Sequence, residues 1–484
     1  MTGRFSRIAR NGFGDPLNAY AHTMAWFDDH LYVGTMRANL HLLSRRRPFP
    51  TTVWPVPRPE DVYDLDLRAQ IWRLSPRRGT WERVLVAPRI VGRTQERVPR
   101  DISYRGMTVM RDAREGVDAL YVTTWAPSKG RGSLVLRSLD GTTFRPVTDP
   151  GLGDPNVSAF RTLTAFRDRL FLSPTAQPGG HTNTPGRPLI LELGPRGEWW
   201  PAAEPGFGDP DNLAVFELAT FADRLYAGTL NAADGFQLWR TDARGEPPYS
   251  WTPVIVGGAG RGPLNEAVVT MAVFRDALYV GTGIQNGGYD REHGVGPGAG
   301  ELIRVWDDDS WDLLVGDPRS SGRRRVGSRS GFGAGFDNPF NGYFWRLGVH
   351  EGRLYLGTFN WSVLLPYLAV EDARGEAAER LRWVGVDRVA QFDGGFDLWS
   401  SADGERWSPV TTNGFGNAYN YGARTVLGTP AGLFVGTANP FGPEVALRSA
   451  NRWVYVPNED GGAEVWHAPS RSRPASRSPG GQSR

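Results

Sequence analysis

Short runs of alternating apolar and polar residues recur along this chain in one fixed order. The run Phe221–Thr229 reads Phe-Ala-Asp-Arg-Leu-Tyr-Ala-Gly-Thr, and Leu238-Trp-Arg240 and Trp251-Thr-Pro-Val254 follow it. Aromatic and β-branched residues in runs this short, bounded by turn residues, are typical of strands. The pattern therefore predicts units of four strands in which a tight turn joins the first strand to the second.

The core of this pattern, Leu-Tyr-x-Gly-Thr or a close variant, occurs seven times. The copies begin at Leu31, Leu120, Leu170, Leu225, Leu278, Leu354 and Leu433. Where no insertion intervenes they are about 50 residues apart, the length of one propeller blade. Repeated four-stranded units predict an all-β fold, a seven-bladed β-propeller with four antiparallel strands per blade. A long β-sandwich is the alternative, but it gives no reason for repeated copies of one motif.

We expect this propeller to span residues 1–458. The expected blades cover residues 11–85, 102–148, 151–203, 206–256, 257–316, 331–411 and 413–458. Residues 459–484 are rich in Ser, Pro, Gly and Arg, which predicts a disordered tail. Deleting residues 462–484 should then leave thermal stability unchanged. Either residues 5–10 or residues 452–456 can supply the outermost strand that closes the ring, and the sequence leaves this choice open.

Five insertions interrupt the repeat, at residues 39–68, 86–101, 284–300, 317–330 and 361–394. All of them fall between the second and third strands of a blade or between two blades. These connections lie on one face of a propeller, and the connections on the other face are short. Because elaborated loops on a rigid scaffold usually carry function, we expect a site at the mouth of the axial channel on the elaborated face.

Composition excludes several kinds of chemistry. The chain has no cysteine, which rules out disulfides, thiolate nucleophiles and cysteine-bound metals. Its single lysine, Lys129, argues against Schiff-base chemistry. A net charge of +3 without a stacking-aromatic motif does not favour nucleic acid. No apolar run has transmembrane length, and the N-terminal residues lack the apolar stretch of a signal peptide. A cytoplasmic, monomeric protein without a membrane partner is therefore the simplest expectation.

Two turns between third and fourth strands carry a further signature. They read Ser138-Leu-Asp-Gly141 followed by Phe144, and Ser401-Ala-Asp-Gly404 followed by Trp407. These turns resemble the Asp-box of sialidase-like propellers, and the chain as a whole resembles bacterial Asp-box and kelch-like β-propeller repeat proteins. The resemblance implies the propeller fold. It does not extend to sialidase activity, because sialidases have six blades and an N-terminal Arg-Ile-Pro motif that this chain lacks.

Aligning the copies on their first tight turn places one residue of each innermost strand in a common register near the axis. These residues are His22, Arg105, Arg161, Phe216, Val269, Trp345 and Arg424, and the next position includes Glu217 and Arg346. Convergent guanidinium groups suit a carboxylate, phosphate or sulfate. The alternative is that each arginine pairs with an acidic residue of a neighbouring blade.

The candidate ligand-binding residues are these arginines, Trp345 and a series of asparagines that follow Gly-Phe-Gly or a variant of it. The set comprises Arg105, Arg161, Arg346, Arg424, Trp345, Asn18, Asn212, Asn265, Asn341 and Asn420. The asparagines can equally well hydrogen-bond the backbone of their own loops. His22 and Glu217 are the candidate acid and base of a catalytic site.

Nothing in the sequence predicts a metal or a cofactor, because His22, His41, His181 and His350 share no ligand spacing. The leading hypothesis is a propeller that binds, and can transform, a small anionic ligand in an arginine-rich pocket at the channel mouth. The alternative is a scaffold that holds a protein partner on the same face.

Overall fold

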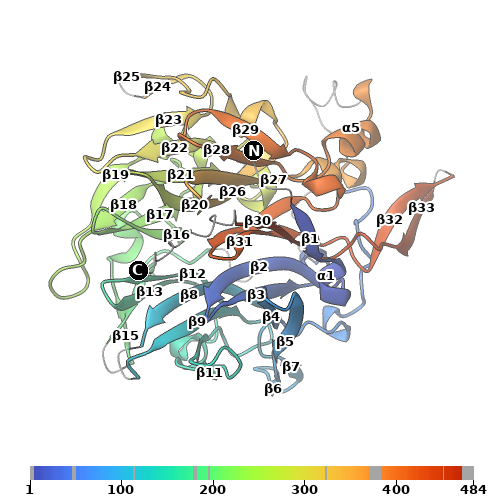
Figure 1. The fold of residues 1–484 in the computed structure, drawn as a ribbon, viewed down its shortest axis with the longest axis horizontal. Coiled ribbons are helices and arrows are strands. Elements are labelled where there is room, and N and C mark those ends of the chain that lie inside the picture. Colours follow the sequence, from blue (N-terminus) through green and yellow to red (C-terminus); the bar gives the residue numbers. More distant parts are fainter. Residues whose placement is uncertain are drawn as a thin grey trace, which may run out of the picture.

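The computed structural model describes residues 5–45, 51–112, 115–177, 182–194, 197–321, 324–369, 383–450 and 452–470. Most of the regular structure in these residues is antiparallel β-strand, arranged in sets around a common centre (Figure 1). No helix in the described part of the chain is both long enough and apolar enough to cross a membrane. The predominance of antiparallel strands around a common centre confirms the expected all-β, propeller-like class.

Antiparallel pairing joins the described strands around the centre into seven consecutive sets of four. The first three sets are β2 (Asn18–Phe27), β3 (His30–Arg37), β4 (Gln70–Ser75) and β5 (Thr80–Val86); β8 (Ser103–Arg111), β9 (Asp118–Trp125), β10 (Val135–Ser138) and β11 (Arg145–Pro146); and β12 (Ala159–Phe166), β13 (Arg169–Thr175), β14 (Leu191–Leu193) and β15 (Trp199–Pro201). The next three are β16 (Ala214–Phe221), β17 (Arg224–Leu230), β18 (Leu238–Thr241) and β19 (Thr252–Ile255); β20 (Ala267–Phe274), β21 (Ala277–Gly283), β22 (Leu302–Val305) and β23 (Trp311–Val315); and β26 (Asn341–His350), β27 (Arg353–Asn360), β28 (Leu398–Ser401) and β29 (Trp407–Thr411).

The seventh set combines the two ends of the chain. It consists of β30 (Gly422–Thr429), β31 (Gly432–Ala438), β34 (Val465–Pro469) and the N-terminal strand β1 (Ser6–Ala9). Arg7 of β1 lies opposite Trp466 of β34, and its guanidinium group bonds the buried Glu464 at 2.9 Å. The strand that closes the last set is therefore the N-terminal one.

Two expectations about the C-terminal region were wrong. Residues 465–469 form a strand inside the last set, although a disordered tail was expected from residue 459. β33 (Arg452–Pro457), expected within the last blade and one of two candidates for its outermost strand, pairs with β32 (Glu444–Ser449) in a separate hairpin that projects from the body (Figure 1). The apolar run of the hairpin has the sequence pattern of a blade strand. β34 lies beside a Ser/Pro/Arg-rich stretch, so its short apolar run was not recognised as a strand. Residues 471–484 lie outside the described part.

The innermost strands of neighbouring sets contact one another in a closed circle that runs β2, β8, β12, β16, β20, β26, β30 and back to β2. An apolar cluster of buried side chains fills each junction between neighbouring sets. Leu31 and Val33 of the first set, for example, pack with Phe434 and Val465 of the last. Burial of such side chains stabilises the fold by about 1.5–3 kcal/mol each, so the core is divided among the junctions.

The repeated Gly-Thr pair has a separate role for each residue. A Cβ on Gly34 would lie 2.7 Å from the Cβ of Tyr104 in the next set, and one on Gly228 would lie 2.4 Å from the Cβ of Val268. Glycine therefore lets the neighbouring innermost strand approach the second strand. The threonine accepts a hydrogen bond from the backbone at the start of the third strand, as when Gln237 N, just before β18, donates to Thr229 Oγ1 at 2.9 Å.

The insertions contain short additional helices and strands, and we call the face on which the insertions lie the loop side. They contain α2 (Asn39–Leu43), η1 (Val62–Asp64), β6 (Arg89–Val91), β7 (Arg97–Pro99), α3 (Gln285–Gly288), β24 (Arg319–Ser321), β25 (Arg324–Val326), η7 (Ser362–Tyr367) and α5 (Val386–Asp393). Single turns precede the innermost strands at α1 (Asn11–Gly14), η2 (Pro150–Gly153), η3 (Pro205–Gly208), η4 (Gly257–Gly260), η5 (Gly262–Asn265), η6 (Ala334–Asp337) and η9 (Gly414–Gly416). Leu40, Trp54, Val62 and Leu364 from two insertions share one apolar cluster.

The two Ser-x-Asp-Gly turns have the same hydrogen bonds. Asp140 Oδ1 accepts from the backbone N–H groups of Thr142 and Thr143 at 2.8 and 2.6 Å. Asp403 Oδ1 accepts from those of Glu405 and Arg406 at 3.0 and 2.8 Å. These aspartates act as structural turn residues at the ends of third strands.

A pair of truncations tests the corrected last set. Ending the chain after Gly462 removes β34, which leaves β1 without a partner and β31 paired with β30 on one side only, so we expect a large loss of thermal stability or no folded protein. Ending it after Ser470 keeps every described strand and serves as the control. Differential scanning calorimetry of both proteins makes the comparison. Equal melting temperatures would contradict the assignment of β34 to the core.

Candidate functional site

A β-bulge lies at the same place in each innermost strand. The pairing register shifts between Ala21 and Thr23 in β2, and the corresponding shift occurs in each of the other six sets. A bulge leaves an extra residue outside the strand ladder and re-aims its side chain. The residues at or within these shifts are those of the predicted common register: His22, Arg105, Arg161, Phe216, Val269, Trp345 and Arg424.

All seven of these residues line one cavity of about 350 Å³, which we call the axial cavity. The insertions supply part of its wall, through Leu40 and Leu43 of α2, Val62 of η1, Gln285 of α3 and Leu364 of η7. The exposed residues Arg45, Arg93 and Asn156 also line it, so the cavity reaches solvent on the loop side. The bulges and the insertions thus build a single pocket.

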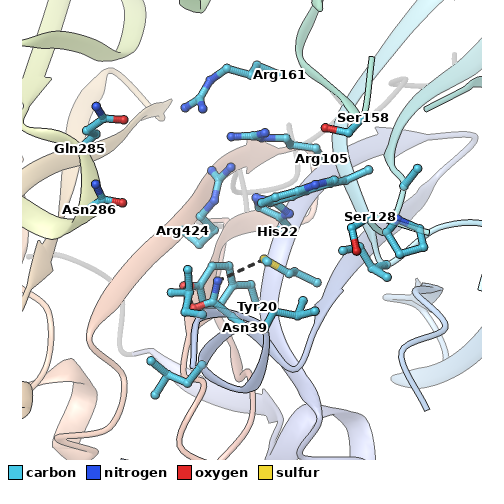
Figure 2. A pocket seen from close by; sticks show the side chains of 18 of the residues that line it. Tyr20, His22, Asn39, Arg105, Ser128, Ser158, Arg161, Gln285, Asn286 and Arg424 are labelled. Atoms are coloured by element: carbon cyan, nitrogen blue, oxygen red, sulfur yellow. Dashed lines mark hydrogen bonds between the residues drawn. The ribbon is translucent and has the colours of Figure 1, made fainter. Parts of the chain in front are cut away.

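Three arginines converge inside the axial cavity. Figure 2 shows the guanidinium groups of Arg105, Arg161 and Arg424 in one part of it, near His22. Each lies against an aromatic ring: Arg105 is 4.9 Å from the ring centre of Trp125, Arg161 is 3.3 Å from that of Phe216, and Arg424 is 5.5 Å from that of Trp345. Aromatic faces hold cations in place by cation–π attraction without neutralising their charge.

No Asp or Glu is among the described residues that line the axial cavity. Arg105 and Arg424 are each only 7% exposed, and the buried Nη1 of Arg424 has no hydrogen-bond partner in the described structure. Burial, followed by the charge of Arg161, holds the pKa of Arg105 well below its usual range. Burial, followed by the charges of Arg346 and Arg105, does the same for Arg424. The positive charge in this cavity therefore costs free energy that no lining carboxylate offsets.

Arg346 differs from the other three arginines. Its Nη1 bonds Oε2 of Glu217 at 3.0 Å, and Glu217 also accepts a hydrogen bond from Thr162 Oγ1 at 3.3 Å. Neither Arg346 nor Glu217 lines the cavity. This pair agrees with the alternative only in that an arginine meets an acid, because Glu217 of the fourth set and Arg346 of the sixth are not in neighbouring sets.

The predicted acid–base pair is not brought together. His22 is buried and its Nδ1 contacts the hydroxyl of Ser103, whereas Glu217 binds Arg346 and Thr162. No described hydrogen bond links His22 to Glu217. Burial, and then the charges of Arg424 and the other three arginines, hold the pKa of His22 well below its usual range. His22 is therefore a neutral polar group in the wall of the cavity.

The loop asparagines Asn18, Asn212, Asn265, Asn341 and Asn420 also differ from the expectation, because none of them lines the cavity. All are buried, and each Nδ2 donates both to a glycine carbonyl of the preceding turn and to a side-chain oxygen at the start of the third strand. For Asn212 the acceptors are Gly206 O at 2.9 Å and Gln237 Oε1 at 2.8 Å. These residues fasten the loops to the strands.

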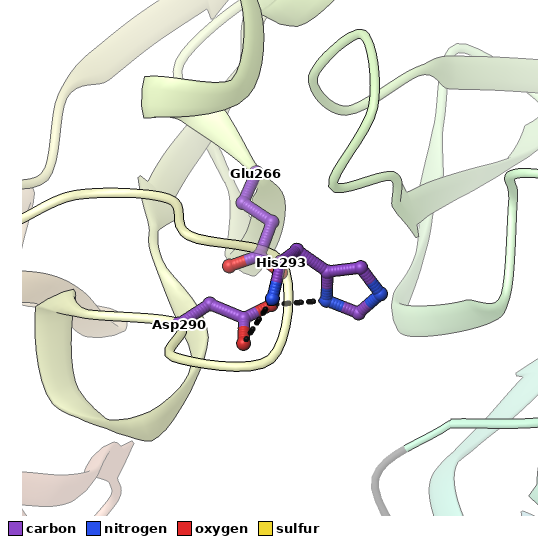
Figure 3. Close-up of side chains that lie close together, drawn as sticks. All are labelled: Glu266, Asp290 and His293. Atoms are coloured by element: carbon purple, nitrogen blue, oxygen red, sulfur yellow. Dashed lines mark hydrogen bonds and ion pairs between the residues drawn. The ribbon is translucent and has the colours of Figure 1, made fainter. Parts of the chain in front are cut away.

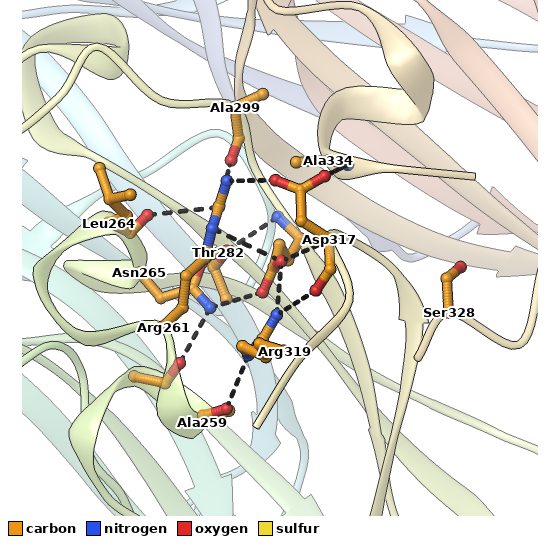
Figure 4. Close-up of polar contacts among 12 residues, drawn as sticks. Ala259, Arg261, Leu264, Asn265, Thr282, Ala299, Asp317, Arg319, Ser328 and Ala334 are labelled. Carbon is orange, nitrogen blue, oxygen red and sulfur yellow. Dashed lines mark hydrogen bonds and ion pairs between the residues drawn. The ribbon is translucent and has the colours of Figure 1, made fainter. Parts of the chain in front are cut away.

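The surroundings of Asn265 show how such a loop neutralises its charges (Figure 4). Asn265 bonds Glu301 Oε2 at 2.7 Å, and Arg319 bonds the other oxygen of Glu301 at 2.8 Å. Arg261 bonds Asp317 at 3.2 Å. Both arginines thus have carboxylate partners.

Several residues of the cavity wall are not among the site residues predicted from the sequence. Trp125 and Phe359 directly follow the threonine of their repeats, as does Met36, and all three line the cavity. Asn39 accepts a hydrogen bond from the hydroxyl of Tyr20 at 2.8 Å, and both face the cavity together with Tyr421. The position after each Gly-Thr could have indicated the first group, because it ends the second strand at the channel mouth.

No protein-family model matches this chain, and no curated protein matches it in sequence. Among solved structures, the WD40 repeats of RRP9 cover 97% of this chain and 99% of their own at 9% identity and a TM-score of 0.46. A prolyl endopeptidase aligns at 10% identity and a TM-score of 0.40, over 84% of this chain and 42% of its own length. An exo-β-1,3-galactanase from Phanerochaete chrysosporium aligns at 8% identity and a TM-score of 0.32, over 70% of this chain and 56% of its own. This chain spans less than half of the endopeptidase, and likeness at this level carries no argument about activity.

Replacing a loop asparagine tests its structural role. Asn212→Ala removes the side-chain donor to the carbonyl of Gly206 and one of the two donors to Gln237 Oε1, so we expect the free energy of unfolding to fall by about 1–3 kcal/mol. The exposed Asn156, in the corresponding loop of the second set, is the matched control, and Asn156→Ala should change it by less than about 0.5 kcal/mol. Urea denaturation measures both. An equal effect of the two substitutions would contradict the assignment.

Proposed function

We propose that the seven strand sets are the blades of one closed seven-bladed propeller, and that the axial cavity binds a small organic anion. The observation that carries this proposal is the charge of the cavity wall. Five arginines and no carboxylate are among the described residues that line it: Arg45, Arg93, Arg105, Arg161 and Arg424. Three of these lie in the interior, on bulges of the innermost strands. An anionic group there would meet several guanidinium groups in a cavity whose described wall carries no carboxylate.

The rest of the wall favours an apolar or aromatic body on this anion. Trp125, Trp345, Tyr343 and Phe359 surround the arginines, and Leu40, Leu43 and Leu364 lie toward the insertions. Pockets of roughly 300–1,000 Å³ with mainly apolar walls and a few polar groups are typical of small-molecule sites, and the cavity of about 350 Å³ falls at the lower end of that range. An aromatic carboxylate, phosphate or sulfonate matches both halves of the site.

The geometry supports binding better than acid–base chemistry. His22 is the only histidine of the described cavity wall that lies beside the three interior arginines, and their charges favour its neutral form. Glu217, the proposed partner, is held by Arg346 outside the wall. We therefore assign the arginines to ligand recognition and His22 to the shape and polarity of the pocket.

Arg424→Met tests the proposal through opposite effects on binding and stability. We expect affinity for benzoate or phenyl phosphate to fall more than about 30-fold, since truncating a desolvated charge contact costs roughly 2–5 kcal/mol. The unfolding free energy of the ligand-free protein should stay constant or rise by about 1 kcal/mol or more, because a buried charge without a carboxylate partner is removed. Isothermal titration calorimetry and urea denaturation give the two quantities.

Two further variants serve as controls. Arg37 is fully buried and bonds Asp15 at 2.7 Å and Asn18 at 2.8 Å, so Arg37→Met should destabilise the ligand-free protein. Arg45 lies at the rim with an exposed ion pair to Asp61, so Arg45→Ala should weaken binding less than about fivefold. Benzamide, the neutral counterpart of benzoate, should not bind measurably. If Arg424→Met destabilises the protein as Arg37→Met does and affinity for the anions is unchanged, Arg424 is structural and the proposal fails.

A scaffold that holds a protein partner is the second candidate function. Exposed apolar side chains near the insertions favour it, since Trp383 is 89% exposed and Phe392 of α5 is 71% exposed. Tyr455 and Leu447 of the projecting hairpin are 41% and 43% exposed. Large exposed aromatic side chains are characteristic of interaction surfaces.

The two functions can be separated by substitution. Trp383→Ser with Phe392→Ser should leave benzoate affinity unchanged within about twofold, because neither residue lines the axial cavity. If the protein has a partner at α5, the same variant should lose that complex, measured by size-exclusion chromatography coupled to light scattering. Loss of benzoate binding in this variant would show that the two sites are not separate.

A further inference from the structure

A second polar cluster lies behind the wall of the axial cavity. It consists of Glu266, which precedes β20, and of Asp290 and His293 in the loop between β21 and β22 (Figure 3). One donor atom from each residue lies within 4.8 Å of the other two. The backbone of Asp290 pairs with that of Val295 through two hydrogen bonds of 2.9 Å, which closes a tight loop around His293. Two separate segments therefore present three ligand-type side chains to one point.

The two carboxylates of this cluster are buried, and the only basic side chain that contacts either of them among the described residues is His293. Glu266 and Asp290 are each 0% exposed, and no arginine or lysine forms an ion pair with either among the described residues. Glu266 Oε2 accepts from the backbone N–H of Gln285 at 2.8 Å, while its Oε1 is buried with no hydrogen-bond partner in the described part of the chain. Asp290 Oδ2 lies 2.6 Å from His293 Nδ1. Adjacent buried carboxylates are costly unless a cation joins them.

We propose that Glu266, Asp290 and His293 bind one divalent transition-metal ion of the zinc type. Calcium and magnesium prefer ligand sets made entirely of oxygen, whereas an imidazole beside carboxylates suits zinc. Two ligands bound at about 2.1 Å in a tetrahedral site lie about 3.4 Å apart, so donor atoms that lie within 4.8 Å of one another must approach by up to about 1.4 Å to hold one ion. Three protein ligands leave a further position for water. His293 is partly exposed, with 34% of its side chain accessible, so the ion can enter from solvent.

The ion would fix one wall of the axial cavity. Gln285 bonds both acids, through its backbone N–H to Glu266 and through Nε2 to Asp290 at 2.8 Å, and Gln285 and Asn286 line the cavity. The metal site is independent of the anion proposed above, because none of its three ligands lines that cavity. The signal for this site in the sequence is the Asp-x-x-His spacing of Asp290 and His293 in the Gly-rich insertion, which the spacing of the other histidines does not show.

Zinc binding is measured on the full chain in the absence of any organic anion. After stripping with a chelator, the protein is dialysed against Zn²⁺, Mn²⁺ or Ca²⁺ alone, and the bound metal is counted by mass spectrometry. We expect one Zn²⁺ per chain, with an affinity that falls about 100-fold or more in His293→Gln and in Asp290→Asn. Glu292→Gln, an exposed acid of the same loop, is the matched control and should retain the ion.

A second measurement keeps the test valid if Asp290→Asn does not fold. Zn²⁺ in large excess over its Kd should raise the melting temperature of the wild-type protein by roughly 2 °C or more and leave that of His293→Gln unchanged. Equal zinc content in the wild-type protein and His293→Gln would overturn the proposal. Binding of Ca²⁺ in preference to Zn²⁺ would overturn the choice of a transition metal.

Discussion

The close approach of neighbouring strands around the axis is the constraint on which the rest of this structure depends. At five of the seven junctions the innermost strand packs against a glycine of the second strand of the preceding set, and a Cβ at Gly34 or Gly228 would collide with the next strand. Steric room at this point lets the sets contact one another in a closed circle. The apolar clusters at the junctions then stabilise the circle, and the pairing of β1 with β34 joins the two ends of the chain in one set.

That packing also creates the site. A bulge in every innermost strand directs one side chain out of the ladder toward the axis, and in three sets this side chain is an arginine. Elsewhere partly buried arginines pair with acids, as at Arg319 with Glu301 and at Arg346 with Glu217. Around the axial cavity the three interior arginines lie against aromatic faces, and no described residue of the lining is a carboxylate. We take this contrast as the physical reason to look for an anion there.

The repeat was predictable because each unit needs the same residues for the same contacts, namely glycine for strand approach, threonine for the third strand and an apolar run for the junction. The last unit was assigned wrongly because the hairpin at 444–457 has a strand pattern, while Val465–Pro469 lies beside a polar stretch. The register of Arg105, Arg161 and Arg424 followed from the turn alignment. The hydrogen-bond partners of these residues were not predictable. The sequence does not distinguish Arg346, which pairs with Glu217, from Arg424. It also does not distinguish an asparagine that bonds two groups of its own loop and strand from one that faces a ligand.

The central claim is that the interior arginines recognise an anionic group, and a crystal structure with 4-bromobenzoate tests it most directly. The bromine gives an anomalous signal that locates the molecule independently of its refined position. The account predicts one molecule per chain in the axial cavity, with its carboxylate within hydrogen-bonding distance of Arg424 Nη1 and its ring against Trp345. An empty cavity at a saturating concentration, or a carboxylate bound only at the rim near Arg45 and Arg93, would contradict it.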